Sequence, residues 1–438
     1  MFHDGTKTLK WATGNTADIS GRIGFAYNSS STNVILDVGS NNVTFASNFT
    51  SVLSTGKITK AGAGKLTITA SNTCASNIVV SAGTLQIGNG TAGSMANISG
   101  INIAGGATLR FEPPTGTVFD KVISGAGKVE IHGVVPAWIS FNAKNTYTGT
   151  TTVSGGNLYI GGTEGDIAGN IILINNRPLL FNRENDYTYS GVISGDGEVK
   201  QCSKNKVTLT GENIYTGRTW VQADEDGGIL QIGDGISGSI NNTSDVYIFE
   251  KQTLCFNPGK EMEFSKPISG EGDVLKTGTG TLTLKGGNPA TGTFTHQEGT
   301  LKFNGKWSGN FVKKTNANLE IMEACLVGKK LTLEGGNISM NLTTGTPSQI
   351  EVTGDVEASG TNTLSITTAA ITNFPIIRAT SGITSTDPYT LNMPGMNGTL
   401  SVISPSQLLL TATVADLTPP FREMAVLLTE RQPNQRQP

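Results

Sequence analysis

The sequence predicts an all-β fold, a right-handed parallel β-helix, from three observations. A phrase of the type N-x-Y-T-G-x-T-x-V-x-x-G-x-L-x-I returns about every 72 residues, at 72–90, 145–162, 213–235 and 288–305. The composition favours strands and turns, with 56 glycines, 15% charged and 6% aromatic residues. Apolar residues alternate over short stretches between glycine breaks, which is typical of short strands separated by turns.

One period has room for about nine short strands, which we divide into three coils of about 24 residues with about three strands each. Connections between parallel strands are overwhelmingly right-handed, so we expect a right-handed superhelix. Equivalent positions would then recur every third coil. The predicted inward slots are one of Leu85, Leu158, Leu230 and Leu301, a second of Ile87, Ile160, Ile232 and Phe303 on the same strand, and Phe111, Phe181 and Phe256 on a second face.

A second phrase is interleaved with the first, as VISGAGKV (122–129), VISGDGEV (192–199) and PISGEGDV (267–274). Both glycines of each copy are predicted to be corners that need a positive φ: Gly125 and Gly127, Gly195 and Gly197, Gly270 and Gly272. A dinucleotide site would need a third glycine and a following helix, which these copies lack. AGAGKLT (61–67) similarly lacks the spacer of a phosphate loop. We therefore interpret these glycines as structural.

Four segments follow from where the repeat is clear and where it fades. We expect N-terminal β-helix coils at 1–56, with truncation as an open alternative, and the repeat β-helix at 57–310. Irregular C-terminal coils are expected at 311–414, and a disordered tail or short capping helix at 415–438. The N-terminus shows no basic start followed by an apolar stretch, so we expect either a removed leader or a fragment of a longer chain.

Charge and hydropathy exclude two classes of partner. The formal net charge is −3, so there is no basic field to attract nucleic acid. Aliphatic runs such as AVLL (425–428) are far too short to span a bilayer, and we expect no membrane insertion by this segment.

The four cysteines, Cys74, Cys202, Cys255 and Cys325, occupy different positions of the repeat and are at least 53 residues apart. In a solenoid such neighbours lie two or more coils apart, beyond the roughly 7 Å that a disulfide spans between Cα atoms. We expect free, mostly buried thiols.

GDVLKTGTGTLTLKGGN (272–288), NTYTGTTTV and NIYTGRTWV resemble the autotransporter-associated β-strand repeat, or passenger-associated transport repeat, of bacterial surface and secreted β-helices. The resemblance covers about 57–310. It implies a β-helical passenger at the bacterial outer membrane or outside the cell. It implies no particular activity, because such proteins adhere, scaffold or carry other domains.

Histidines and acidic residues are the candidates for a chemical site. His3, His132 and His296 have no second histidine at ligand spacing, so no metal site is predicted, and His296 occupies the strand position of Val153. Asp224, Glu225 and Asp226 form an acidic turn, with a calcium or glycan contact as the alternative to a solvated loop. Glu184 and Asp186 form a second acidic patch. Neither patch has a Lys, Arg or His expected beside it.

Partner contacts are expected where the repeat is broken, at 222–228, 183–189 and 134–144, and at exposed tryptophans among Trp138, Trp220 and Trp307. The sequence predicts a non-catalytic extracellular passenger or stalk, adhesin-like or structural, with no catalytic, cofactor-binding or metal-binding residues. A monomer that contacts a host or neighbouring-cell protein or glycan is expected. The alternatives are a polysaccharide lyase or hydrolase on the same scaffold, and a trimeric phage or viral fibre.

Overall fold

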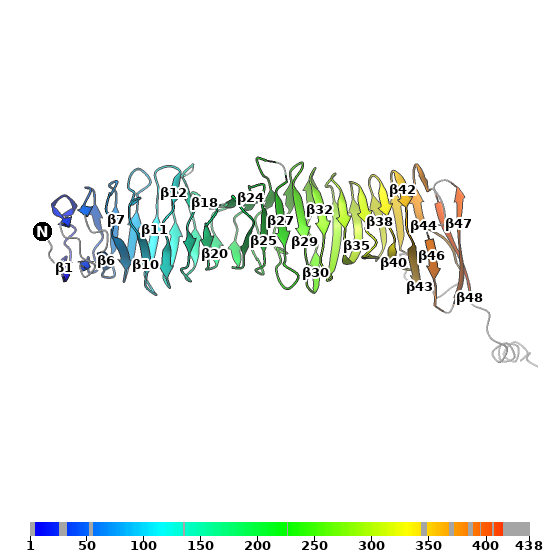
Figure 1. The fold of residues 1–438 in the computed structure, drawn as a ribbon, viewed down its shortest axis with the longest axis horizontal. Helices are drawn as coiled ribbons and strands as arrows, with labels where there is room; N and C mark the ends of the chain where they lie inside the picture. Colours follow the sequence, from blue (N-terminus) through cyan, green and yellow to red (C-terminus); the bar gives the residue numbers. More distant parts are fainter. Residues whose placement is uncertain are drawn as a thin grey trace, which may run out of the picture.

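The computed structural model describes residues 5–25, 33–51, 56–134, 136–225, 227–342, 348–367, 372–383, 389–394, 396–404 and 407–414. Short strands stack along one long axis, and the chain runs from blue to red along it without turning back (Figure 1). The fold is an all-β parallel solenoid with about 22 residues per turn. The one helical element among the described residues is a 3-10 turn, η1 (Ser20–Arg22). Asp226 and the tail at 415–438 lie outside them.

Each turn in the middle of the rod contributes one strand to each of three faces. Strand β22 (Tyr187–Tyr189) lies on face 1, β23 (Ile193–Gly195) on face 2 and β24 (Val199–Gln201) on face 3, after which β25 (Lys206–Leu209) pairs in parallel with β22. A face can contain more than one sheet along the axis. We assign strands of different sheets to the same face when they occupy the same place in the turn. The predicted three strands per coil are therefore present here, whereas the right-handed winding stays a prediction.

The strands of each face stack in chain order. Face 1 comprises β1 (Thr6–Lys10), β3 (Asn33–Asp37), β6 (Lys57–Ala61), β8 (Asn77–Val80), β10 (Gly100–Ile103), β13 (Ile123–Gly125), β16 (Lys144–Asn145), β19 (Asp166–Ile167), β22, β25, β27 (Ile229–Ile232), β29 (Thr253–Phe256), β32 (Asp273–Lys276), β34 (Phe294–His296), β36 (Phe311–Lys313), β39 (Leu331–Leu333), β42 (Asp355–Ala358) and β45 (Gly382–Ile383). Face 2 comprises β4 (Val43–Phe45), β7 (Lys65–Ile68), β9 (Thr84–Ile87), β11 (Thr108–Phe111), β14 (Lys128–Ile131), β17 (Thr151–Val153), β20 (Ile171–Leu173), β23, β30 (Glu261–Phe264), β33 (Thr281–Asn288), β35 (Gly299–Trp307), β37 (Ala317–Ile321), β40 (Gly336–Asn341), β43 (Asn362–Thr367) and β46 (Tyr389–Asn392). Face 3 comprises β2 (Gly24–Phe25), β5 (Thr50–Ser51), β12 (Thr117–Phe119), β15 (Trp138–Phe141), β18 (Asn157–Gly162), β21 (Leu179–Arg183), β24, β26 (Thr219–Val221), β28 (Val246–Ile248), β31 (Ile268–Gly270), β38 (Ala324–Val327), β41 (Gln349–Val352) and β44 (Thr372–Ala379).

The inward side chains of the three faces meet in one continuous apolar core. Strands bury alternate residues, such as the first and third of β17 and β26, because successive side chains point to opposite sides of a sheet. Burying each Leu, Ile or Val contributes about 1.5–3 kcal/mol, so the alternation seen in the sequence is what holds the coils closed.

The turn is shorter than predicted, and this changes how the 72-residue period maps onto the rod. Parallel pairing carries the chain from Leu85 to Ile193 in five steps, or about 22 residues per turn rather than 24. A period of about 72 residues is then about three and a third turns, not three coils. Each repeat is thus rotated by one third of a turn from the one before it.

The predicted stacking of equivalent positions is wrong for the same reason. Leu85 lies on face 2 in β9, Leu158 on face 3 in β18 and Leu230 on face 1 in β27, and the fourth equivalent, in β35, returns to face 2. The phenylalanines do not mark a second face either. They lie one turn above the isoleucines of the same repeat, in the pairs Ile87 and Phe111, Ile160 and Phe181, and Ile232 and Phe256.

The two interleaved phrases of the repeat lie on successive turns and bind one another. The side-chain oxygen of Asn145 accepts a hydrogen bond from the backbone N–H of Ile123 at 2.8 Å. The same bond joins Asn213 to Ile193 at 2.9 Å and Asn288 to Ile268 at 3.2 Å. The side chain of the asparagine of N-x-Y-T-G therefore takes the place of a backbone carbonyl as the hydrogen-bond acceptor for the I-S-G strand one turn below it.

The glycines of the two phrases also stack at this corner. Gly125, Gly195 and Gly270 have φ between 96° and 102°, as predicted for corners. The second glycine of each I-S-G-x-G was also expected to need a positive φ, and that is wrong. It is needed for a close approach, because a Cβ atom at Gly197 would overlap the carbonyl oxygen of Arg177 on the turn below. The glycine of Y-T-G one turn above sits in turn on this backbone, as Gly217 does on Gly197.

Buried polar side chains close other corners from inside. The ammonium groups of Lys60 and Lys276 donate to three backbone carbonyls each, at 2.5–2.7 Å and 2.8–2.9 Å. Burial lowers the pKa of each of these lysines to about 8. The lysine of the repeat, in KAGAG and KTGTG, therefore stabilises the glycine corner that follows it by hydrogen bonds from inside the coil.

His296 lies fully buried in β34 between Lys276 and Lys313, its partners on the adjacent turns. Burial, with the two neighbouring cations, lowers the pKa of His296 to about 3. The folded protein thus keeps this imidazole neutral, while the unfolded chain binds a proton below about pH 6.5.

Replacement of His296 by valine, the residue of the equivalent Val153, is expected to remove part of the protein's acid sensitivity. Because the unfolded state binds the additional proton, His296 lowers the free energy of unfolding by up to about 1.4 kcal/mol for each pH unit between 6.5 and 3. Denaturant unfolding measured at several pH values should show a shallower decline for His296→Val than for the original protein. Equal slopes would contradict a neutral, buried His296.

The C-terminal end of the rod departs from parallel stacking. Strands β47 (Met396–Ser404) and β48 (Gln407–Val414) form an antiparallel hairpin, and β48 pairs antiparallel with β44. Figure 1 shows this hairpin at the red end of the solenoid. It covers the edge of the last parallel strand of face 3, an edge that would otherwise be open to pairing with another chain.

Candidate functional site

A stripe of aromatic side chains lies on the outside of face 3. Pairing of β15, β18, β21, β24, β26 and β28 fixes one outward column along the axis, which contains Ser140, Tyr159, Leu180, Lys200, Trp220 and Tyr247. Trp138 packs against Tyr159 with ring centroids 5.4 Å apart, and Trp220 against Tyr247 at 5.6 Å. We call Trp138, Tyr159, Trp220, Tyr247 and the adjoining Phe249 the aromatic stripe; all five are partly exposed.

Two cations lie over the central ring of the stripe. The guanidinium of Arg218 is 4.7 Å and the ammonium of Lys200 5.2 Å from the ring centroid of Trp220. Each cation is also paired with a carboxylate, Arg218 with Asp245 at 2.8 Å and Lys200 with Glu198 at 2.9 Å. These contacts fix the position of the indole, and each cation beside it is neutralised by a carboxylate.

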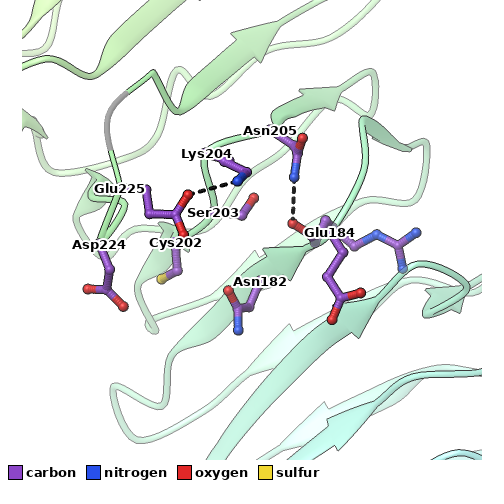
Figure 2. Close-up of a pocket in the computed structure, with 9 residues that line it drawn as sticks. Asn182, Glu184, Cys202, Ser203, Lys204, Asn205, Asp224 and Glu225 are labelled. Atoms are coloured by element: carbon purple, nitrogen blue, oxygen red, sulfur yellow. Dashed lines mark hydrogen bonds and ion pairs between the residues drawn. The ribbon is translucent and has the colours of Figure 1, made fainter.

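A polar hollow adjoins the stripe where β21, β24 and β26 end. This corner recess has a volume of about 340 Å³ and is lined by Asn182, Arg183, Glu184, Cys202, Ser203, Lys204, Asn205, Asp224 and Glu225 (Figure 2). Asn182 and Cys202 follow Leu180 and Lys200 by two residues. They therefore point to the same outer side, and the stripe and the recess form one surface.

The cationic groups of the recess are each engaged by carboxylate or carbonyl oxygens. Lys204 forms an ion pair with Glu225 at 2.9 Å, and that hydrogen bond raises the pKa of the lysine. Arg183 donates its guanidinium hydrogens to the carbonyls of Gly161, Gly165 and Thr163 inside the coil. Its guanidinium therefore stabilises the corner of the coil. Burial raises the pKa of the Cys202 thiol to about 11, which keeps it protonated at neutral pH.

The structure brings together all three loops proposed for partner contacts. Loops 183–189 and 222–228 form two walls of the recess, and 134–144 contains β15 with Trp138 at one end of the stripe. Glu184 and Asp224 line the hollow from opposite sides, with Cys202 and Asn182 between them in Figure 2. The expectation that no basic residue accompanies the acidic turns is wrong. Lys204 lies one turn below Glu225, and its place beside the acidic residues could not be predicted without knowing the length of a turn.

The tryptophans have different roles. Trp138 and Trp220 belong to the outer surface, but Trp307 is fully buried and donates its indole N–H to the carbonyl of Gly292 at 3.2 Å. Trp307 is therefore part of the core. Tyr159, Tyr247 and Phe249 were missed in the sequence, although their outward place in alternating strands was a usable signal.

The remaining candidates give no further site in the part of the chain that the structure describes. No group of three or more His, Cys, Asp or Glu residues there could hold a metal ion. His132 is partly exposed beside Glu130, with 3.6 Å between Nε2 and the carboxylate. Cys74, Cys255 and Cys325 are buried, Cys202 is partly exposed, and all four are free thiols. In the same residues, no helix has the length and apolar character that a bilayer crossing requires.

Comparison with known families agrees with the period. The family model called passenger-associated-transport-repeat matches 58–87, 140–160, 205–223 and 274–303. Each match contains one corner asparagine: Asn72, Asn145, Asn213 or Asn288. The chain carries passenger-associated transport repeats. These four repeats are the rotated units of the solenoid described above.

A curated relative was found as well. The chain is 28% identical over 209 residues to a protein described as adhesin BmaC autotransporter, from Brucella suis biovar 1 (strain 1330). The match covers 43% of this chain and 6% of the relative. In its passenger-associated repeats and in this distant similarity, the chain resembles autotransporter passengers.

Proposed function

We propose that this chain is a non-catalytic part of a bacterial extracellular passenger, a monomeric right-handed β-helical rod that attaches to a partner through the outer surface of face 3. The observation that carries the proposal is the aromatic stripe beside the corner recess. Partly exposed aromatic rings gathered on one face are typical of interaction surfaces. Trp138 and the acidic residues of the recess lie at 134–144, 183–189 and 222–228, where the chain departs from its own repeat.

The comparisons support the location and the kind of function. Passenger-associated repeats imply a secreted or cell-surface place, and the similar Brucella protein is described as an adhesin. The expected partner is a protein or glycan on a host or neighbouring cell. The 72-residue unit supplies length and stiffness, because the buried asparagine and glycine corners hold successive turns together.

A polysaccharide lyase or hydrolase is the second candidate, because the recess gathers Glu184, Asp224, Glu225 and Lys204. A lyase needs a base whose pKa lies near the working pH. Lys204 is exposed, and its pKa is raised by Glu225 rather than lowered. Incubation with pectate, alginate and hyaluronan should produce no unsaturated or shortened products. Turnover that is lost in Lys204→Met would support the enzyme instead.

The adhesive function predicts that the purified rod binds to cells or matrix proteins in a saturable manner. Binding is measured by flow cytometry and on coated plates, with the rod labelled at its N-terminus. Two surface variants make the test specific. Trp220→Ala should reduce attachment, whereas Ile236→Ala, which removes an apolar side chain that is 78% exposed outside the stripe, should not. Absence of attachment to every surface would contradict the proposal.

A further inference from the structure

We propose that the aromatic stripe and the corner recess together bind a neutral polysaccharide or glycan chain that lies along the axis of the rod. This inference rests on the proposed adhesive function and specifies the chemistry of its ligand. The ligand class follows from three properties of the surface: its linear shape, its ring faces and its balanced charge.

The surface is linear and parallel to the axis. Tyr159 and Tyr247 occupy the same column of face 3 and are separated by four strand steps, through Leu180, Lys200 and Trp220. With about 4.8 Å per step the rings span about 19 Å, and Trp138 lengthens this by one more step. A surface of this length, centred on one column of side chains, fits an extended chain better than a compact ligand.

The rings are held in place before any ligand arrives. Trp220 is packed against both Tyr247 and Phe249, with centroid distances of 5.6 and 6.1 Å, and the Arg218 guanidinium lies 4.7 Å from its ring centroid. Binding therefore requires little side-chain ordering, which favours affinity. The C–H faces of pyranose rings stack on such fixed aromatic faces.

The charges argue against an acidic polymer. Lys200, Arg218 and Lys204 are each already paired, with Glu198, Asp245 and Glu225. The further carboxylates that line the recess, those of Glu184 and Asp224, would repel an anionic chain. A sugar hydroxyl is both donor and acceptor, so paired ions and the amides of Asn182 and Asn205 can satisfy it without any net charge on the ligand.

The corner recess is the second part of the same site. It opens beside Leu180 and Lys200, where the stripe has no aromatic ring between Tyr159 and Trp220. A chain stacked on both ring clusters would pass this gap. A branch or substituent of the chain could then occupy the hollow and contact its amides and carboxylates.

The test uses the full chain and a panel of neutral hexasaccharides: cellohexaose, N-acetylchitohexaose, xylohexaose and maltohexaose, with a heparin hexasaccharide as anionic comparator. Isothermal titration and quenching of tryptophan fluorescence measure binding. At least one neutral hexasaccharide should bind. Trp220→Ala and Tyr247→Ala should each weaken it by about tenfold, while Trp220→Phe, which keeps a ring, retains most of the affinity.

Ile236→Ala is the matched control and should bind like the original protein. Thermal unfolding of each variant shows that the rod remains folded. The inference is overturned if the heparin fragment alone binds, if binding ignores both ring-removing variants, or if no neutral hexasaccharide binds while the rod still attaches to cells. That last result would leave the adhesive function in place with a protein as its partner. Loss of all attachment would overturn both.

Discussion

Replacing Gly217 with alanine should destabilise the rod by about 3 kcal/mol or more, because the new methyl group has no room at the stacked corner. A Cβ atom at this position would overlap the carbonyl oxygen of Gly197 on the turn below. That neighbour is backbone in a hydrogen-bonded ladder and cannot move aside as a side chain could. The two turns would have to separate, which weakens the bond between Asn213 and Ile193 as well.

Gly287 provides the control for this variant. A methyl group added at this glycine would meet no atom within 4 Å, and the residue is exposed in β33, so Gly287→Ala should leave stability nearly unchanged. Thermal and urea unfolding, followed by circular dichroism, compare the two variants. Limited proteolysis should locate the first cleavages of Gly217→Ala near that corner. Equal stability of the two variants would show that the corners are not closely stacked.

Replacing Asn213 with alanine is expected to cost about 3 kcal/mol of the free energy of unfolding, since buried groups lose their partners. Its oxygen accepts the N–H of Ile193, and its amide donates to the carbonyls of Gly211 at 2.8 Å and Ser239 at 3.1 Å. All of this lies in the interior, where an unpaired polar group costs about 1–3 kcal/mol. The effect should extend to both turns that the asparagine joins.

Asn242→Ala, at an exposed position two residues past Ile240, is the matched control and should change stability by less than about 0.5 kcal/mol. Hydrogen exchange gives the decisive measurement, because the amide of Ile193 donates its hydrogen to the side chain of Asn213. Asn213→Ala should release that amide first. If its protection were unchanged, the bridge between the two phrases would not exist in solution.

Much of the fold could be predicted from the sequence because its signals are local. Alternation in TTV and TWV identifies strands, and the glycine of I-S-G identifies a corner with positive φ. The length of a turn is not local. It depends on how many residues each corner needs, and a difference of two residues per turn was enough to move Leu158 and Leu230 to other faces than that of Leu85.

The site was predictable only in part for the same reason. Acidic loops and tryptophans could be recognised one at a time, but Glu184, Lys204 and Asp224 are separated by 20 residues each and meet only when the turn is known. Trp307 could not be assigned to the interior, because a large aromatic residue fits either side of a strand until its neighbours are placed.

The one-third rotation of each repeat sets a rule for how such a protein can change length. Gain or loss of a single 72-residue unit would turn everything beyond it by one third of a circle, so that a surface once aligned with face 3 would look out from another side. Three units restore the original alignment. The length of the rod and the direction in which its binding surface points therefore change together. Duplication can lengthen the rod without turning that surface only when three units are added at once.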